Sequence, residues 1–201
     1  SANLPIDNWQ IVPVACAGMV PAAALLSSLS SGARSVGILR CVEECAQQSK
    51  NTIDGRIDYA KHVLERTGFD PARIVDFAPA DSQATPGIPE VTEPTSTKNV
   101  AINIFGHTAA STSVLALNEL SPTTIEPFSH PYSPIGVPVV NSAGCTMCGT
   151  CSAVCPAGAL SQINSEGRIE LTLDAAKCIA CGECVASCPE IANEAIELSL
   201  Q

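Results

Sequence analysis

The sequence is poor in aromatic residues and in positive charge. Only 3% of its 201 residues are Phe, Trp or Tyr, and 10 Lys and Arg stand against 20 Asp and Glu, which gives a formal net charge of −10. A surface this acidic repels the phosphates of nucleic acids. We therefore expect no nucleic-acid partner, and the negative charge suits either solubility or docking onto a basic face of a partner protein.

The sequence has no uninterrupted hydrophobic run long enough for a membrane span. The stretch between Ile11 and Leu29 is almost entirely apolar or small, but Pro13 and Pro21 interrupt it. No basic residue precedes it, and Asp7 stands where a signal peptide carries positive charge. We expect a soluble, cytoplasmic chain without a membrane span.

Recognisable catalytic motifs are also missing. The sequence contains no phosphate-binding glycine fingerprint, no serine in a nucleophile-elbow context and no carboxylate pair in a recognisable site. We therefore expect no catalytic residues and no independent enzymatic activity.

Cysteine, in contrast, is abundant, with 11 residues, and eight of them form two runs of identical spacing. The runs are Cys145-x-x-Cys148-x-x-Cys151-x-x-x-Cys155-Pro156 and Cys178-x-x-Cys181-x-x-Cys184-x-x-x-Cys188-Pro189. Three thiolates at this spacing wrap three corners of one [4Fe–4S] cube, and the fourth cysteine of each run ligates the other cluster. This predicts two clusters, the first held by Cys145, Cys148, Cys151 and Cys188, and the second by Cys178, Cys181, Cys184 and Cys155.

Structural zinc is the main alternative for paired Cys-x-x-Cys motifs, since two pairs build one tetrahedral site. Zinc does not require the third cysteine at the same step or the fourth before proline. Disulfides fit less well. Successive thiols with only two residues between them make poor bridges, and no secretory context is visible. Metal thiolates indicate a reducing compartment.

The two runs belong to an internal repeat. Gly149 and Gly182 both follow the second cysteine, where a glycine lets the chain bend close to the metal and direct N–H groups at sulfur. An apolar stretch that predicts a strand precedes each run, at residues 137–140 and 169–173. Residues 159–171 also predict a hairpin, with the turn at residues 164–167.

On these motifs, residues 135–201 resemble bacterial-type ferredoxin domains that carry two [4Fe–4S] clusters. All eight ligands and both prolines are present. The resemblance implies a ferredoxin-like α+β fold and one-electron transfer between the two clusters.

The N-terminal part alternates between strand and helix patterns. We expect strands at residues 10–15, 35–40 and 73–77, and helices at residues 20–31 and about 55–67. The second helix should bury Ile57, Ala60, Val63 and Leu64 on one face, and Gly68 should end it. Strands separated by helices predict a small parallel α/β layer.

Ligands collect at the carboxyl ends of such strands, which is where Cys16 and Cys41 fall, with Cys45 one turn further on. The surrounding sequences are Pro13-Val-Ala-Cys-Ala-Gly-Met-Val-Pro21 and the segment from Gly32 to Cys45. They resemble the delta subunit of methyl-viologen-reducing hydrogenases. The resemblance implies a truncated flavodoxin-like layer, a candidate [2Fe–2S] cluster on these cysteines, and electron transfer to flavoprotein, hydrogenase or heterodisulfide-reductase partners.

A [2Fe–2S] cluster needs four ligands, and this segment offers three cysteines. The alternative is that Cys16 and Cys41 are ordinary buried cysteines that act as small hydrophobic residues. His62 is a formal fourth candidate, but its position in the middle of a helix beside Lys61 is typical of a solvated histidine. His107 has no metal-like partner at helical spacing.

The domain organisation follows from these patterns. We expect a hydrogenase-delta-subunit-like domain at residues 1–78, a Pro-, Ser- and Thr-rich linker with a connector helix at 79–134, and a ferredoxin domain at 135–201. The connector helix should lie within residues 99–120, with an interruption near Gly106. Because the chain starts at Ser1, we expect a processed N-terminus or a segment of a longer protein.

The sequence thus predicts an iron–sulfur electron-transfer module, part of a larger flavin- or hydrogenase-linked redox complex. The alternative is a docking module whose α/β domain recruits a partner oxidoreductase, with the ferredoxin as its only redox-active part. A purely structural role for the clusters, as in some nucleic-acid enzymes, fits the acidic charge and the paired clusters less well.

Overall fold

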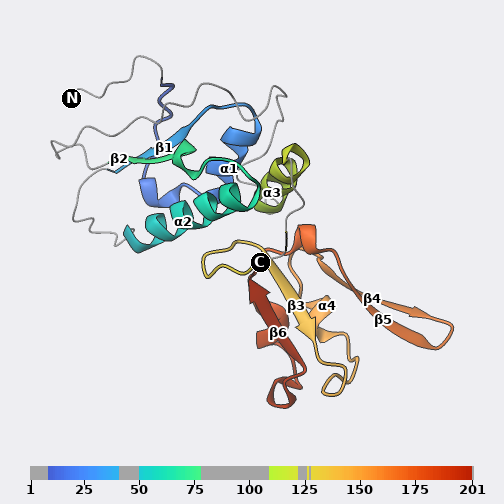
Figure 1. The fold of residues 1–201 in the computed structure, drawn as a ribbon. Helices are drawn as coiled ribbons and strands as arrows, with labels where there is room; N and C mark the ends of the chain where they lie inside the picture. Colours follow the sequence, from blue (N-terminus) through green and yellow to red (C-terminus); the bar gives the residue numbers. More distant parts are fainter. Residues whose placement is uncertain (1–8, 41–49, 78–108, 122–125, 127, 201) are drawn as a thin grey trace. The chain divides into compact units, whose positions relative to one another are not determined.

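The computed structural model describes residues 9–40, 50–77, 109–121, 126 and 128–200 (Figure 1). The chain divides into two compact units. The N-terminal unit comprises residues 1–105 and 113–126, and the C-terminal unit comprises residues 106–112 and 127–201. Each unit is described by itself below.

The N-terminal unit is a small α/β layer. Its elements are η1 (Ala17–Met19), α1 (Ala22–Ser30), β1 (Val36–Leu39), α2 (Lys50–Arg66), η2 (Pro71–Arg73) and β2 (Ile74–Phe77). Strands β1 and β2 pair in parallel, with Val36 opposite Ile74 and Leu39 opposite Phe77. Parallel strands need a crossover, and α2 lies in it. The predicted parallel layer is confirmed.

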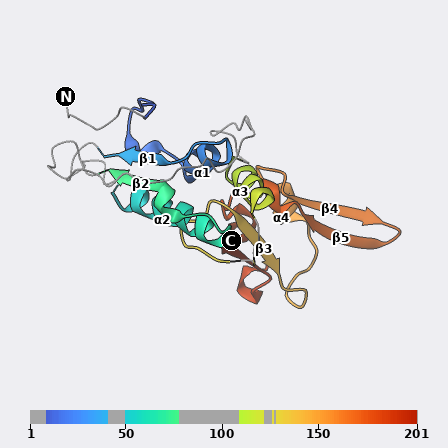
Figure 2. The ribbon, with the colours of Figure 1, turned by 45° about the horizontal axis from the view of Figure 1, so that its top comes forward.

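Helices α1 and α2 pack on each other, and each also contacts one of the strands (Figures 1 and 2). The predicted apolar face of α2 is confirmed, since all four of its members are buried: Ile57, Ala60, Val63 and Leu64. Leu26 and Leu29 of α1 and Tyr59 of α2 are fully enclosed. Burial of each such side chain contributes roughly 1.5 to 3 kcal/mol before entropy is counted.

Two sequence-based expectations for this unit need correction. No strand forms at residues 10–15, where Ile11, Val12 and Val14 are exposed and Pro13 lacks the N–H that a ladder needs. Helix α2 begins at Lys50 instead of about Gly55. Its first three residues are polar, and the buried Ile53 extends the apolar face by one turn.

Helix α3 (Ala109–Leu120) is the observed part of the predicted connector helix. Its Leu117 is fully buried, and the Ser113 hydroxyl donates to the carbonyl of Ala23 at 3.4 Å within the N-terminal unit. Residues 78–108, which hold most of the predicted linker and the interruption at Gly106, lie outside the described residues. The predicted domain boundaries therefore stay predictions.

The C-terminal unit contains two antiparallel strand pairs and short helical turns. Its elements are β3 (Gly136–Val140), α4 (Thr150–Ala153), β4 (Leu160–Ser165), β5 (Arg168–Leu173), η3 (Ala175–Lys177), α5 (Glu183–Ala186), η4 (Ile191–Asn193) and β6 (Ile196–Leu200). Strand β3 pairs with β6, and β4 pairs with β5. Strand β3 precedes the first cysteine run and pairs with β6, which follows the second run. Strand β4 follows the first run and pairs with β5, which precedes the second run. This exchange is the pairing expected of an internal repeat.

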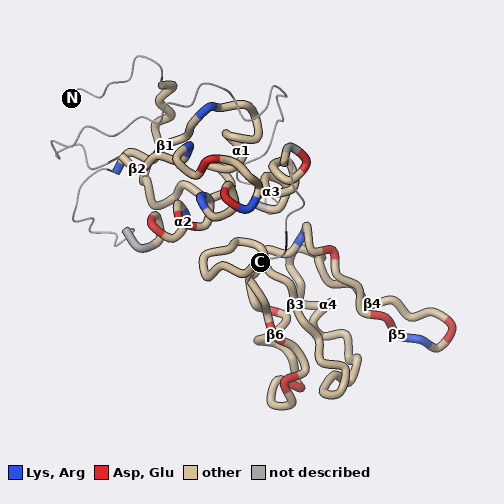
Figure 3. Tube along the Cα trace, viewed as in Figure 1, with Lys and Arg blue, Asp and Glu red and all other residues tan. Residues whose placement is uncertain are grey.

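The predicted hairpin is confirmed as β4 and β5, in which Ser165 lies opposite Arg168, but its turn lies at residues 166–167 instead of 164–167. Its two turn residues, Glu166 and Gly167, have φ of 50° and 77°. Two positive φ angles are typical of a type I′ turn, whose twist matches that of the flanking strands. Figure 3 shows acidic charge at this tip.

No helix in the described parts of the chain is both long enough and apolar enough to cross a bilayer.

Candidate metal centre

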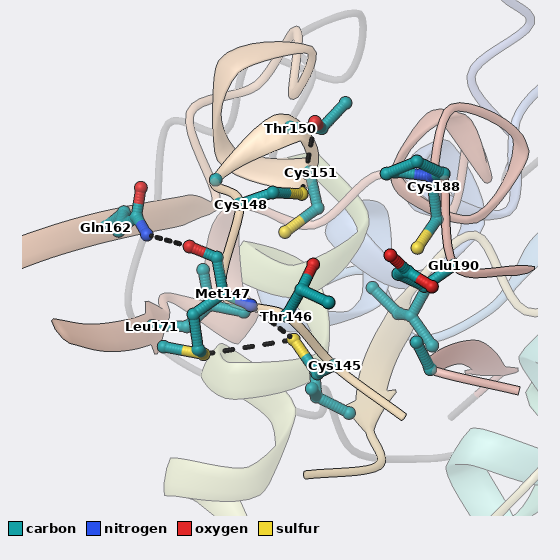
Figure 4. A pocket seen from close by; sticks show the side chains of 15 residues that line it. Cys145, Thr146, Met147, Cys148, Thr150, Cys151, Gln162, Leu171, Cys188 and Glu190 are labelled. Atoms are coloured by element: carbon teal, nitrogen blue, oxygen red, sulfur yellow. Dashed lines mark hydrogen bonds between the residues drawn. The ribbon is translucent and has the colours of Figure 1, made fainter. Parts of the chain in front are cut away.

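Four cysteines from two distant segments line one pocket of the C-terminal unit (Figure 4). Cys145, Cys148 and Cys151 come from the first run, and Cys188 comes from the end of the second. The pocket has a volume of about 430 Å³ and an apolar floor formed by Val140, Leu171 and Ile196. We call it the first site.

The other four cysteines line a second pocket of about 340 Å³, which we call the second site. Cys178, Cys181 and Cys184 come from the second run, and Cys155 comes from the end of the first. Leu160 and Leu198 are among its apolar walls. Each pocket therefore combines three cysteines of one run with the fourth cysteine of the other, which is the grouping expected from the spacing.

The backbone bends in the same way in both runs. Met147 and Gly149 have φ of 56° and 79°, and the equivalent Ala180 and Gly182 have φ of 54° and 76°. These left-handed residues reverse the chain between the cysteines, and α4 or α5 then begins at the next residue. The glycine positions behave as the sequence predicts.

Strand β4 supports the first of these bends. The Gln162 amide donates from Nε2 to the carbonyl oxygen of Met147 at 2.7 Å (Figure 4). The amide lies so close to Gly149 that a Cβ there would come within 2.1 Å of Gln162 Oε1. Glycine suits this position because of its positive φ, and a Cβ there would also displace the Gln162 amide.

Polar groups are directed at the sulfurs. The Met147 N–H donates to Cys145 Sγ at 3.4 Å, and the Ala159 N–H donates to Cys155 Sγ at 3.3 Å. The Thr150 hydroxyl lies 3.3 Å from Cys148 Sγ. Donors at this distance stabilise negative charge on sulfur, as thiolate ligation requires.

The N-terminal cysteines are only partly described. Cys16 is half-buried and directly precedes η1, and Arg56 of α2 fixes this loop by donating from Nη1 to the carbonyls of Gly18 and Val20 at 2.6 and 3.1 Å. Cys41 and Cys45 lie outside the described residues. The predicted convergence of the three thiols therefore stays a prediction.

The residue before Cys41 is held firmly. Arg40 donates from Nε and Nη2 to the two carboxylate oxygens of Asp76 at 2.8 and 2.7 Å, and it also pairs with Asp54 of α2. These ion pairs lie at the carboxyl end of the two-stranded sheet. At the same end, Trp9 packs edge-on against Phe77 with ring centres 5.3 Å apart.

Both units contain segments that match known families. Residues 144–192, which contain all eight cysteines of the two runs, match the 4Fe-4S dicluster domain. The chain carries a 4Fe-4S dicluster domain. Residues 3–98 match the methyl-viologen-reducing hydrogenase delta subunit, so the N-terminal unit contains a delta-subunit domain. No curated protein matches the chain.

The dicluster domain is an electron-transfer domain, and its eight cysteines support two [4Fe–4S] clusters. The residues present fit that group. Among the described residues, no three His, Cys, Asp or Glu side chains converge closely enough to hold a single metal ion. The cysteines of the dicluster domain instead line two pockets, four cysteines to each. A multi-atom cluster suits such a lining better than one zinc ion, which draws four donors to within about 2.3 Å of one point.

The thiols of the dicluster domain are tuned by their surroundings. Burial, aided by the neighbouring cysteines, raises the pKa of Cys151 and of Cys184. Hydrogen bonding with Thr150 lowers the pKa of Cys148. For Cys155, burial acts in the opposite sense, but hydrogen bonds from the backbone at residues 157–160 together lower the pKa of its thiol. Metal binding displaces the proton from each thiol. A positive metal therefore stabilises the thiolate form most at the buried sulfurs.

His62 does not join a metal site in the described residues. It lies on α2 with its side chain 37% exposed, and its Nδ1 is 3.9 Å from a carboxylate oxygen of Glu65. This agrees with the solvated histidine expected from the sequence. His107 lies outside the described residues.

Four polar residues around the first site were not expected from the sequence: Thr146, Thr150, Gln162 and Glu190. A comparison of the two repeats could have found three of them. Thr146, Thr150 and Glu190 differ in chemistry from the residues at the equivalent positions of the repeat, which are Ile179, Glu183 and Ala157. Gln162 gives no such signal, because it acts from a hairpin strand.

Proposed function

We propose that this chain is a relay for single electrons, with two [4Fe–4S] clusters as its carriers. The first site would hold one cluster on Cys145, Cys148, Cys151 and Cys188, and the second site would hold the other on Cys155, Cys178, Cys181 and Cys184. The observation that carries this proposal is that each pocket is lined by three cysteines of one run and the last cysteine of the other.

When bound, the clusters supply one-electron chemistry, with a potential set by hydrogen bonds, charge and solvent around the sulfurs. The chain holds the sulfurs on two short helical turns and two left-handed bends. Apolar residues of the strands, among them Leu160 and Ile196, pack against cysteines of both sites, whereas Cys148 and Cys181 are exposed. Crossed ligation would tie the two halves of the repeat together, as their exchanged strands do.

The proposal extends to the whole chain. Residues 1–78 would form a truncated flavodoxin-like delta-subunit domain, residues 79–134 a linker, and residues 135–201 a ferredoxin-like α+β domain. The delta-subunit match supports a [2Fe–2S] cluster on Cys16, Cys41 and Cys45 as the entry point of the relay. A fourth ligand would have to come from outside this set.

The partners would be a flavoprotein, a hydrogenase or a heterodisulfide-reductase type of subunit. The delta-subunit match supports a place in such a complex. The charge of the C-terminal unit supports docking onto a basic surface, since Arg168 and Lys177 stand against a larger acidic set: Glu166, Glu170, Asp174, Glu183, Glu190, Glu194 and Glu197 (Figure 3).

Coulometric reduction of the full chain, purified without oxygen, tests the relay. Two cubanes take up about two electrons per chain. A chain that retains its iron but takes up no electrons would contradict the relay and indicate structural clusters. An additional electron that disappears in Cys16→Ser would support a cluster in the delta-subunit domain. An uptake of two electrons that Cys16→Ser leaves unchanged would support the docking alternative for that domain.

A further inference from the structure

The two sites differ at one equivalent position. Thr150 is the first residue of α4 and Glu183 is the first residue of α5, and each stands two residues after the second cysteine of its run. The backbone leading to them is the same, because Gly149 and Gly182 have φ and ψ of 79° and 1° and of 76° and 0°. The Cβ of Glu183 is therefore placed relative to Cys181 as the Cβ of Thr150 is relative to Cys148.

The chemistry at this position is opposite in the two runs. Thr150 Oγ1 lies 3.3 Å from Cys148 Sγ, and either atom could donate in the free chain. A metal-bound sulfur has no proton, so in the loaded site the hydroxyl is the donor. Glu183, at the equivalent position beside Cys181, is exposed, does not line the second site and carries a carboxyl group in place of the hydroxyl donor.

A reduced cluster carries one more negative charge than an oxidised one. A hydrogen-bond donor on a ligand sulfur stabilises the reduced form, whereas a nearby carboxylate destabilises it. We propose that Thr150 and Glu183 set the two sites to different reduction potentials, so that the first site accepts an electron before the second. This inference rests on the proposed relay function.

One group acts against this order. Glu190 lines the first site, and the equivalent position in the second site is Ala157 (Figure 4). The effect of Glu190 is reduced because it is half-exposed and its Oε2 accepts a hydrogen bond from the Asn193 amide at 2.7 Å. Glu183 is exposed and does not line the second site, so Glu190 has no carboxylate counterpart there. The hydroxyl of Thr150, 3.3 Å from Cys148 Sγ, opposes the effect of Glu190. Thr146, which also hydrogen-bonds to Cys148, stands where the second run has Ile179.

The dicluster domain's repeat provides a reciprocal experiment. Redox titration of the full chain, with dithionite as reductant and EPR detection, should resolve two one-electron steps. Thr150→Val should lower the upper potential and leave the lower one in place. Glu183→Thr should raise the lower potential. Both single variants should narrow the gap, and the double variant Thr150→Glu with Glu183→Thr should reverse the order of the sites.

Two controls separate this tuning from structural damage. Thr150→Ser keeps the hydroxyl and should retain the wild-type potentials. Glu166→Gln removes one negative charge at the hairpin tip, outside the lining of both pockets, and should move neither step. Shifts in Thr150→Val and Glu183→Thr that do not exceed the shift in Glu166→Gln would overturn the inference.

Iron and acid-labile sulfide distinguish the failure of this inference from failure of the relay. Wild-type protein with both clusters but no response to the substitutions would reject only the roles of Thr150 and Glu183. Wild-type protein without clusters would reject the proposed function itself. If Thr150→Val loses its cluster, the rise of the lower potential in Glu183→Thr still decides, because that substitution adds a donor.

Discussion

Met147 and Ala180 share the same left-handed backbone conformation, with φ of 56° and 54°, at equivalent places between the first two cysteines of each run. Neither is glycine, so each conformation costs about 1 kcal/mol. The cost recurs in both runs because the chain must turn there to bring its next cysteine to the same pocket. The repeat is therefore visible in the backbone as well as in the cysteine spacing.

Substitutions at Ala180 test this strain. Ala180→Gly should be tolerated and should stabilise the holoprotein by up to about 1 kcal/mol, because glycine adopts this φ without a steric penalty. Ala180→Val should shorten the lifetime of the cluster absorbance on heating, since a branched side chain opposes positive φ. Equal lifetimes for the two variants would mean that the left-handed bend is not retained.

Serine at the fourth cysteine tests crossed ligation. Cys188→Ser should damage the cluster of the first site, and Cys155→Ser should damage that of the second, because each residue lines the pocket of the other run. EPR of the reduced variants shows which cluster signal remains. The potential of that signal, compared with the two wild-type potentials, identifies the cluster. Loss of the cluster formed by the edited run itself would contradict the assignment.

Gly149 and Gly182 form a matched pair. Alanine at either position costs about 1 kcal/mol for its positive φ. Only Gly149→Ala should also displace the Gln162 amide and break its bond to Met147, because a Cβ at Gly182 has no atom within 4 Å. That lost hydrogen bond adds about 1 kcal/mol.

Thermal loss of the cluster absorbance should therefore occur earlier in Gly149→Ala than in Gly182→Ala. Adding Gln162→Ala to Gly149→Ala should give no further loss, since the bond is already broken. If the two alanine variants are equally stable, the contact of Gln162 with this bend does not stabilise the site.

Arg40 should stabilise the delta-subunit domain. Its side chain is 13% exposed and forms a two-pronged pair with Asp76, and the hydrogen bond with Asp76 raises the pKa of the guanidinium despite burial. Arg40→Gln should lower the free energy of unfolding by about 1 to 2 kcal/mol, a range reduced for the solvent exposure of both carboxylates.

Circular dichroism during thermal unfolding measures this effect, with Arg34→Gln as the control because Arg34 is exposed in the same segment. The effect of Arg40→Gln should shrink at high salt, which screens the pair. A loss no greater than that of Arg34→Gln would show that the pair contributes nothing to stability.

The sequence was most informative where covalent chemistry dictates spacing. Three cysteines with two residues between neighbours, followed by a fourth before proline, are compatible with few structures. The pocket grouping, the hairpin and the left-handed glycines could therefore all be predicted from residues 135–201. The apolar face of α2 was equally clear, because Ile57, Ala60, Val63 and Leu64 follow the helical period.

Prediction failed where tertiary contacts decide. The apolar residues around Pro13 suggest a strand, but a strand needs a neighbour, and these residues find none in the described part of the unit. The contacts of Gln162 with Met147 and of Arg40 with Asp76 join residues far apart in sequence, and no local pattern marks them.

Iron and acid-labile sulfide, measured per chain on protein purified without oxygen, test the central claim most directly. The account predicts about eight irons and about eight sulfides for the two cubanes, and about ten irons if the delta-subunit domain also holds a two-iron cluster. A chain that contains zinc and no labile sulfide would contradict the account.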